Sequence, residues 1–341
     1  MIYLDYNATA PLRPEARAAM EPWWGRPANP SAAHSLGRDA AMAVDRARAA
    51  VAAMVGWPAE GVVFTSGASE SNATVLSRGR WAVSAVEHPS VAKWGAAVLP
   101  VDGHGRVELG AIDVVDGVDG VSVMLANNES GVVQPIAAVI ERARRRGWVV
   151  HVDAAQAPGR VDLADLRGAD FVTLASHKLG GPQGVGALLV SPRLAAAPLV
   201  PGAAQERGWR AGTHNVAGIV GFGAAALAVG APLSGALRDR LEAALVARGG
   251  VVAGAGAPRM PNTTFVAFEG REAPELVMAL DLAGVAVSAG SACASGAARP
   301  SAVLAAMGFR GSAVRFSLGV ATTESEVDAA ITAVDTVLAY G

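Results

Sequence analysis

Cysteine is almost absent from this sequence: Cys293 is the single one among 341 residues. One thiol cannot form an internal disulfide framework or a zinc site built from cysteines, and such scarcity suits a reducing compartment. Strong charge of either sign is also lacking, because the formal net charge is -2. A chain so close to neutrality gives no reason to expect nucleic acid or an anionic membrane surface as a partner.

Sequence signals for secretion or membrane insertion are lacking as well. The N-terminus, MIYLDYNATAP, has no basic start followed by an apolar run, so we expect no signal peptide. The stretch 211–237 has no Lys, Arg, Asp or Glu and is long enough to imitate a membrane span. It consists mostly of Gly and Ala, which transfer poorly into lipid. We expect a packed core helix with Asn215 as its N-cap, in a cytoplasmic protein.

Hydrophobic residues make up 52% of the chain and charged residues 17%, which describes a globular protein with a large core. Apolar runs and amphipathic helical segments alternate as far as residue 190, and this pattern favours a mainly parallel sheet covered by helices. Beyond residue 230 the pattern changes to α+β. We therefore predict an α/β fold with a large domain of residues 15–230 and a smaller α+β domain formed by residues 1–14 and 231–341.

The positions of the main elements follow from hydrophobic periodicity. Strands are expected over 62–65, 81–86, 121–126, 148–152, 171–174, 185–190 and 263–268. Helices are expected over 35–55, 136–146, 237–246 and 275–283.

The stretch FVTLASHKLGGPQGVGALLV, residues 171–190, carries Lys178 on a Gly- and Pro-rich turn between two apolar runs. A lysine in such a turn is either a solvated loop charge or an amine placed at the rim of a core for Schiff-base chemistry. The turn alone leaves these two interpretations about even.

Two further segments favour the second interpretation. Asp153 ends the apolar run 148–152, where the carboxyl ends of parallel strands bind ligands, although a helix N-cap would look the same. The segment TSGASESN, residues 65–72, can open a helix whose amides and hydroxyls bind an anion, although an ordinary serine cap would look the same. Together with Lys178, these are the parts that pyridoxal phosphate requires: a phosphate site, a carboxylate for the ring nitrogen and an amine for the aldehyde.

Motifs in one order along nearly the whole chain resemble those of the class V aminotransferase group of fold-type I enzymes, and within it the NifS/IscS-like cysteine desulfurases. These motifs are YLDYNATAPLRPE, NPSAAHSLGR, FTSGASESN, VEHPSV, NNESGVVQPI, HVDAAQAPGR, SHKLGGPQGVGAL, QERGWRAGT, SAGSACASGAARPS and VRFSLGVATTESEVD. The resemblance implies a pyridoxal phosphate enzyme that converts L-cysteine to L-alanine and leaves the sulfur on Cys293 as a persulfide.

The resemblance also assigns roles to individual residues. Lys178, His88 and Cys293 are the implied catalytic residues, with Lys178 and His88 moving protons and His88 stacking on the ring. The implied cofactor-binding residues are Ala68, Ser69, His88, Asn128, Asp153, Gln156, Ser176, His177, Lys178 and Thr213. Asp153 would serve the ring nitrogen, Gln156 the ring oxygen, and Thr213 the phosphate of a partner subunit in a homodimer. Asn7, Asn128 and Arg315 are the implied substrate-binding residues.

Several alternatives stay open on the sequence. Ala175 stands where the family usually has a hydroxyl, so either Ser176 holds the phosphate instead or one hydrogen bond is absent. Arg315 binds the substrate carboxylate or forms a structural ion pair. A lone cysteine is often buried and inert, but the segment 288–300 is too rich in Gly and Ser to pack a core, and we expect a mobile loop that exposes Cys293.

The activity has alternatives too. Selenocysteine lyase or cysteine-sulfinate desulfinase activity would use the same pocket, and a non-catalytic scaffold homologue is a candidate from a different class. By analogy, the sulfur acceptor is a protein of Fe–S cluster assembly. No resident metal is expected, and Cys293 could lend at most one transient thiolate ligand to a cluster built elsewhere.

Overall fold

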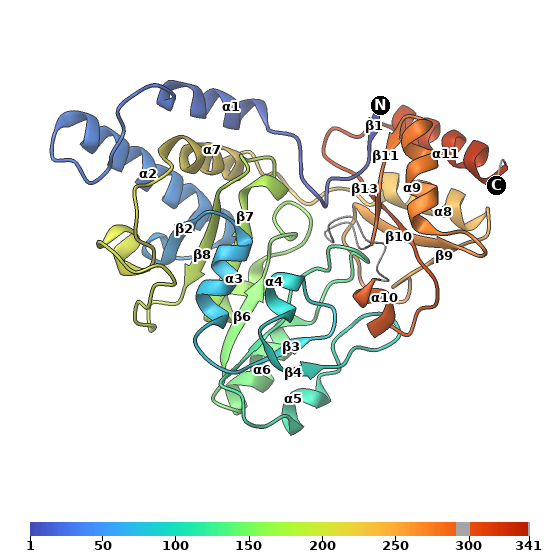
Figure 1. Cartoon of the computed structure of the whole chain (residues 1–341), viewed down its shortest axis with the longest axis horizontal. Coiled ribbons are helices and arrows are strands. Elements are labelled where there is room, and N and C mark those ends of the chain that lie inside the picture. Colours follow the sequence, from blue (N-terminus) through green and yellow to red (C-terminus); the bar gives the residue numbers. More distant parts are fainter. Residues whose placement is uncertain (291–300, 340–341) are drawn as a thin grey trace.

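The computed structural model describes residues 1–290 and 301–339. Its elements form two groups, which Figure 1 shows on the left and on the right of the view. The left group contains the large sheet, and the right group contains a smaller sheet with the last helices of the chain. Cys293 lies outside the described residues, so the exposure of its thiol stays a prediction.

The large sheet has seven strands in the order β2-β8-β7-β6-β5-β3-β4. These strands are β2 (Val62–Thr65), β3 (Trp81–Ser84), β4 (Gly95–Leu99), β5 (Gly120–Ser122), β6 (Val149–Asp153), β7 (Phe171–Ala175) and β8 (Gly186–Val190). Only β8 runs antiparallel to its neighbours β2 and β7; all other pairs are parallel. The predicted α/β fold with a mainly parallel sheet is therefore confirmed.

Two predicted strands end earlier than expected, 81–86 at Ser84 and 121–126 at Ser122. The apolar run 121–126 forms regular strand only to Ser122, yet its backbone stays bonded to β6, with Val123 N donating to His151 O and Leu125 N to Asp153 O. The run is therefore extended over most of its length, and the polar residues that follow it are carried to the edge of the sheet.

Helices cover the large sheet. They are α1 (Pro14–Met20), α2 (Ser35–Val55), α3 (Ala68–Leu76), α4 (Pro89–Ala92), α5 (Gly110–Val114), α6 (Ile136–Arg145) and α7 (Val216–Leu227). The side chain of Asn215 caps α7 by accepting from Gly218 N, as predicted. A Cβ on Gly223 of α7 would lie 2.6 Å from Cα of Ala47 in α2, so this glycine lets the two helices approach closely. None of the helices in the described part of the chain is long and apolar enough to cross a membrane.

The smaller sheet has the order β12-β13-β10-β9 and is antiparallel throughout. Its strands are β9 (Gly250–Val252), β10 (Thr263–Phe268), β12 (Ser288–Ala289) and β13 (Val314–Ser317), and the helices around it are α8 (Ala236–Val246), α9 (Ala273–Leu282), α10 (Ala302–Ala306) and α11 (Glu324–Ala339). The N-terminal β1 (Ile2–Tyr3) pairs in parallel with β11 (Val285–Ala286), which joins the start of the chain to this half.

The two largest clusters of buried apolar side chains accompany the two sheets. One core draws its buried side chains from positions between Ala16 and Ala226, and the other combines Leu4 with positions between Leu241 and Val334. Another cluster joins Val86 and Val101 of the first half to Phe265 and Leu304 of the second, so the division into a large domain, 15–230, and a smaller domain, 1–14 plus 231–341, stays a prediction.

Candidate active site

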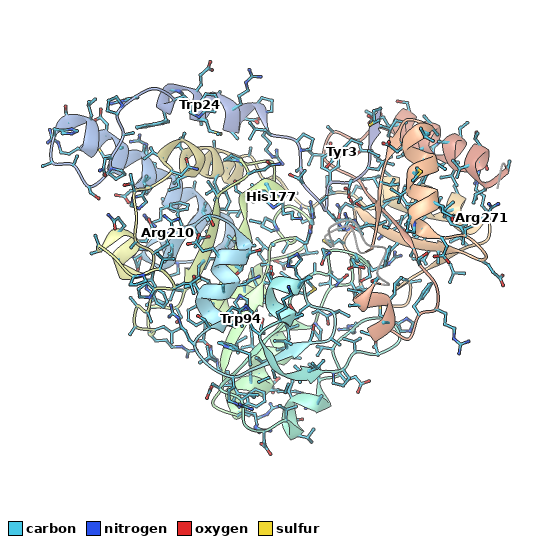
Figure 2. All side chains as sticks on the ribbon, viewed as in Figure 1. Tyr3, Trp24, Trp94, His177, Arg210 and Arg271 are labelled. Carbon is cyan, nitrogen blue, oxygen red and sulfur yellow. The ribbon has the colours of Figure 1, made fainter. Side chains whose placement is uncertain are left out.

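The carboxyl ends of the parallel strands meet at one edge of the large sheet, and a cavity of about 650 Å³ lies there. Polar side chains of both halves of the molecule line it, and the labelled His177 in Figure 2 marks its position at the centre of the molecule. The lining includes these residues singled out from the sequence: Asn7, Ala68, Ser69, His88, Asn128, Asp153, Gln156, His177, Lys178 and Arg315. Ser176 and Thr213 do not line it.

Lys178 lies on a short helical turn, Ser176–Lys178, directly after β7. Its amine Nζ donates to the carbonyl oxygens of Asn7 and Ala8, the latter at 2.8 Å. The N-terminal segment therefore crosses the cavity beside the amine, and Lys178 is not the solvated loop charge of the first interpretation.

His177, the neighbour of Lys178, contacts the same N-terminal segment, with Nδ1 3.1 Å from Oγ1 of Thr9. Burial lowers the pKa of His177 to about 4, and the positive charges of Lys178 and Arg160 act in the same direction. The imidazole is therefore neutral at pH 7 and adds no charge to the cavity.

Asp153 ends β6 and is 5% exposed. Its Oδ1 accepts from Ala155 N at 3.0 Å, and its Oδ2 accepts from the side-chain amide of Asn72 at 2.9 Å. The carboxylate therefore caps the following turn and also lines the cavity, so the two interpretations of this residue are compatible. Sequence reasoning did not single out Asn72, although its place one helical turn after Ala68 was a usable signal.

The start of α3 is the segment for which the sequence predicts an anion site. Its N-cap is Gly67, which has no side chain to cap the helix, so the first backbone N–H groups are left for another acceptor. Gly67, Ala68 and Ser69 all line the cavity. A Cβ on Gly186 in β8 would lie 2.7 Å from Cα of Gly67, so glycine is required where this strand passes the start of α3.

Ser176 is fully buried, and its Oγ has no hydrogen-bond partner within the described residues. The hydroxyl faces Gly181, where an added Cβ would come within 2.1 Å of it. Ala175 lines the cavity instead. This arrangement favours the second alternative, in which one hydrogen bond to a phosphate is absent, over replacement of the missing hydroxyl by Ser176.

Thr213 lines a separate cavity of about 80 Å³, together with Glu206 and His214. Its side chain is exposed. In a single chain it does not reach the cavity of Lys178, so its assignment to a partner subunit's phosphate stays a prediction.

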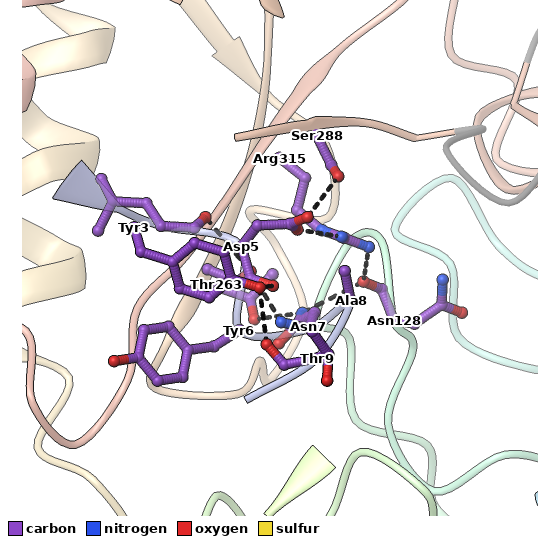
Figure 3. Close-up of polar contacts among 12 residues, drawn as sticks. Tyr3, Asp5, Tyr6, Asn7, Ala8, Thr9, Asn128, Thr263, Ser288 and Arg315 are labelled. Atoms are coloured by element: carbon purple, nitrogen blue, oxygen red, sulfur yellow. Dashed lines mark hydrogen bonds and ion pairs between the residues drawn. The ribbon is translucent and has the colours of Figure 1, made fainter. Parts of the chain in front are cut away.

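Arg315, in β13, is 4% exposed and belongs to a network that Figure 3 shows in close-up. Its Nη2 pairs with Oδ1 of Asp5 at 2.5 Å, and its Nη1 donates to the carbonyl oxygen of Asn128 at 2.9 Å. Asn7 donates from Nδ2 to the same carbonyl at 3.2 Å. The ion pair with Asp5 was one of the two alternatives, and the guanidinium also lines the cavity. Sequence reasoning missed Asp5, because nothing local links positions 310 residues apart.

His88 follows β3 and caps the short helix α4, with Nδ1 2.8 Å from Oγ of Ser90. Burial lowers its pKa, and the charge of Lys178 lowers it further, while Asp153 opposes the shift. The side chain is therefore a neutral imidazole at pH 7, able to accept a proton inside the cavity.

Glu87 directly precedes His88 in the sequence and is almost fully buried. Its Oε1 accepts from Ser84 Oγ at 2.6 Å and from Met124 N at 2.8 Å, while Oε2 has no hydrogen-bond partner in the described part of the chain. Burial raises the pKa of Glu87 to about 8, against the pull of these two donors. The carboxyl group is therefore protonated at neutral pH.

We expect Glu87→Gln to change the pH dependence of stability. A folded pKa of about 8 against 4.5 for the unfolded chain means that this group's stabilising effect is full below pH 4.5 and is lost as pH rises through 8. The free energy of unfolding of the variant should equal that of wild type at pH 5 and should be higher at pH 9 by on the order of 3 kcal/mol. Denaturant unfolding at several pH values measures this, with Glu87→Ala as the control that loses both hydrogen bonds. Parallel pH curves for wild type and Glu87→Gln would contradict an elevated pKa.

Comparison with known proteins gives the family. The model for aminotransferase class V matches residues 2–330. The chain is 42% identical to a cysteine desulfurase of Cereibacter sphaeroides, over 96% of this chain and 93% of the relative, and 38% identical to the cysteine desulfurase NifS of Azotobacter vinelandii, over 99% and 92%. A solved NifS-like protein of Rickettsia africae matches with a TM-score of 0.91 and 30% identity over 99% of each chain. The structure of SspA in complex with cysteine matches with a TM-score of 0.80 and 29% identity over 93% of this chain and 99% of that one. The chain belongs to the aminotransferase class V family.

Proposed function

We propose that this protein is a pyridoxal phosphate-dependent cysteine desulfurase, which converts L-cysteine to L-alanine and transfers the sulfur to Cys293. The observation that carries the proposal is the convergence of Lys178, Asp153 and the uncapped start of α3 on one cavity. They lie at the carboxyl ends of three different strands, β7, β6 and β2, and the three become neighbours only at the shared edge of the sheet. The relatives named cysteine desulfurase support the choice of reaction within the family.

The residues of the cavity fit the proposed cofactor. Backbone N–H groups at the start of α3 would hold its phosphate, and the buried carboxylate of Asp153 would keep its ring nitrogen protonated. Lys178 would hold the aldehyde, and the amide of Gln156 would face the ring oxygen. When bound, pyridoxal phosphate would supply an electron-withdrawing ring that stabilises the negative charge left at Cα when a proton departs.

Arg315 would bind the substrate carboxylate. A guanidinium can pair with a carboxylate through two parallel hydrogen bonds, provided that its plane is fixed. The contacts with Asp5 and with the Asn128 carbonyl fix the plane of Arg315 at the cavity wall. Asn7 bonds to the same carbonyl and would complete the substrate side of the site.

Lys178 and His88 would move the protons. Without cofactor, the amine of Lys178 donates to two backbone carbonyls, so it already lies at the cavity before the cofactor binds. His88 is neutral at pH 7 because burial lowers its pKa, and it can therefore take up a proton that Lys178 or the substrate releases. The thiolate of Cys293 would then attack the substrate sulfur, so that alanine leaves and a persulfide stays on the protein.

The wider assignments follow from the same family membership. We propose a homodimer in the cytoplasm, in which Thr213 contacts the phosphate of the partner subunit. The sulfur would pass from Cys293 to an acceptor or scaffold protein of Fe–S cluster assembly, in line with the relative named NifS.

Incubation with L-cysteine and a reductant tests the proposal. Sulfide and alanine should appear in equal amounts, and Cys293→Ala should lose persulfide formation and almost all turnover of L-cysteine, by roughly 10³-fold. Selenocysteine and cysteine sulfinate serve as comparison substrates. Faster turnover of either one, together with little effect of Cys293→Ala, would favour the lyase or desulfinase alternative. Absence of alanine from all three substrates would favour the non-catalytic scaffold.

A further inference from the structure

Arg160 is a buried cation that has no carboxylate partner among the residues that the structure describes. It is 6% exposed, and within residues 1–290 and 301–339 its guanidinium donates only to neutral oxygen atoms. Burial lowers the pKa of Arg160 to about 10, and the charge of Arg315 acts in the same direction, so the group is still charged at neutral pH. Taking a cation out of water without an anion is unfavourable, and such a group is retained where its hydrogen bonds have a use.

The hydrogen bonds of Arg160 join the segments that build the cavity. Nη1 donates to Oε1 of Gln156, and Nη2 donates to the carbonyl oxygens of Tyr6 and Lys178, both at 3.1 Å. The turn that carries Lys178, the turn after β6 and the N-terminal segment are therefore held by one planar group.

The bond to Gln156 determines which way that amide faces. A guanidinium can only donate, so the atom of Gln156 that faces Arg160 must be the amide oxygen. The amide nitrogen Nε2 is then on the other side, where it donates to Asn7 O at 2.9 Å. An amide nitrogen carries two hydrogen atoms, and Gln156 lines the cavity. Arg160 thus makes Gln156 a donor toward the cavity.

We propose that Arg160 is a positioning residue, which holds the Gln156 amide so that an anionic oxygen of the bound cofactor meets a hydrogen-bond donor. This inference rests on the proposed function, because it concerns how the chain receives pyridoxal phosphate. A donor at that oxygen stabilises its negative charge and so weakens proton binding by the nitrogen that Lys178 contributes. The consequence is measurable in the pH dependence of cofactor absorbance.

The first test needs no cofactor. Gln156→Glu would give Arg160 the carboxylate that it lacks, but it would also replace the donor to Asn7 O by a carboxylate oxygen. The matched comparison is therefore Gln156→Leu, which loses both side-chain bonds: in the cofactor-free protein the glutamate variant should melt above the leucine variant by about 2 °C or more. Gln156→Leu leaves Nη1 only the backbone oxygen of residue 156, at 3.4 Å, and should melt below wild type. A glutamate variant that melts below wild type by as much as the leucine variant would show that Arg160 and position 156 do not interact.

The second test uses the cofactor-loaded protein and follows its near-visible absorbance against pH. Arg160→Met and Gln156→Leu should each raise the midpoint by about one pH unit, a tenfold change in proton affinity. The double variant should shift no further than Gln156→Leu alone, because Arg160 acts through that amide. Arg160→Lys keeps the charge without the planar fork and should shift as Arg160→Met does. The other charged or titratable groups around the amine stay unchanged in all variants: Asp5, Glu70, His88, Asp153, His177 and Arg315.

Three results would overturn the positioning role. If Arg160→Met kept the wild-type midpoint of the absorbance titration, Arg160 would be a purely structural residue. A wild-type midpoint in Arg160→Lys alone would assign the effect to charge. Additive shifts in the double variant would separate Arg160 from Gln156. Failure of the proposed function itself would look different, since wild type would then bind no pyridoxal phosphate and show no band at all.

Discussion

Replacing Lys178 by alanine is expected to abolish the turnover of L-cysteine, with kcat falling by about 10⁴-fold or more, because the amine is both the attachment point of the cofactor and a proton carrier. The yellow absorbance of the loaded protein should disappear in the same variant. The surroundings of Lys178 support a large effect: its Nζ is held by the carbonyls of Asn7 and Ala8, and no other lysine lines the cavity in the described part of the chain.

The chain offers a matched control for this experiment. Lys93 is exposed at the end of α4 and does not line the cavity. Lys93→Ala removes the same functional group and should leave both absorbance and kcat unchanged. Alanine production by Lys178→Ala at a rate close to that of wild type would contradict the assignment of this lysine.

The overall architecture could be predicted because apolar runs mark the strands in the sequence and polar residues mark their ends. Asp153 follows an apolar run, and α/β sheets bind ligands at the carboxyl ends of their parallel strands, so the sequence could place this carboxylate at a ligand site. Lys178 and the start of α3 were joined to it by the set of groups that pyridoxal phosphate requires. The strand pattern has limits of its own. It could not give the length of β5, because an apolar run that stays hydrogen-bonded can leave regular strand geometry without any change in residue type.

The contacts that orient the site could not be predicted from local pattern. The pair between Arg315 and Asp5 and the bond from Arg160 to Tyr6 O join positions far apart in the sequence. A buried arginine also looks the same in sequence as a solvated one, since side-chain length and charge are identical. For Ser176 the difficulty was geometric: strand alternation ends at Ala175, so the sequence could not say which of the two neighbours faces the cavity.

Asp153→Asn should lower kcat by roughly 10²–10³-fold while the protein stays folded, because a neutral amide no longer keeps the cofactor's ring nitrogen protonated. Both oxygens of Asp153 accept hydrogen bonds, from Ala155 N and from the Asn72 amide. An asparagine can accept only at one of these positions and must direct its own N–H₂ at the other donor. The substitution therefore removes the charge and also disturbs the geometry.

A variant at Asp170 is the control for the simple loss of a buried carboxylate. It is 1% exposed and accepts from Arg144, Arg193 and Val150 N directly before β7, at the end of the strand away from the cavity. Asp170→Asn should lower the melting temperature but leave kcat of the loaded protein unchanged. The kcat of Asn72→Ala should lie between those of Asp153→Asn and Asp170→Asn, because this variant removes one hydrogen bond from Asp153 and keeps the charge. If Asp153→Asn bound pyridoxal phosphate and retained wild-type kcat, the carboxylate would have no part in the chemistry, and the cavity would need another group to protonate the ring.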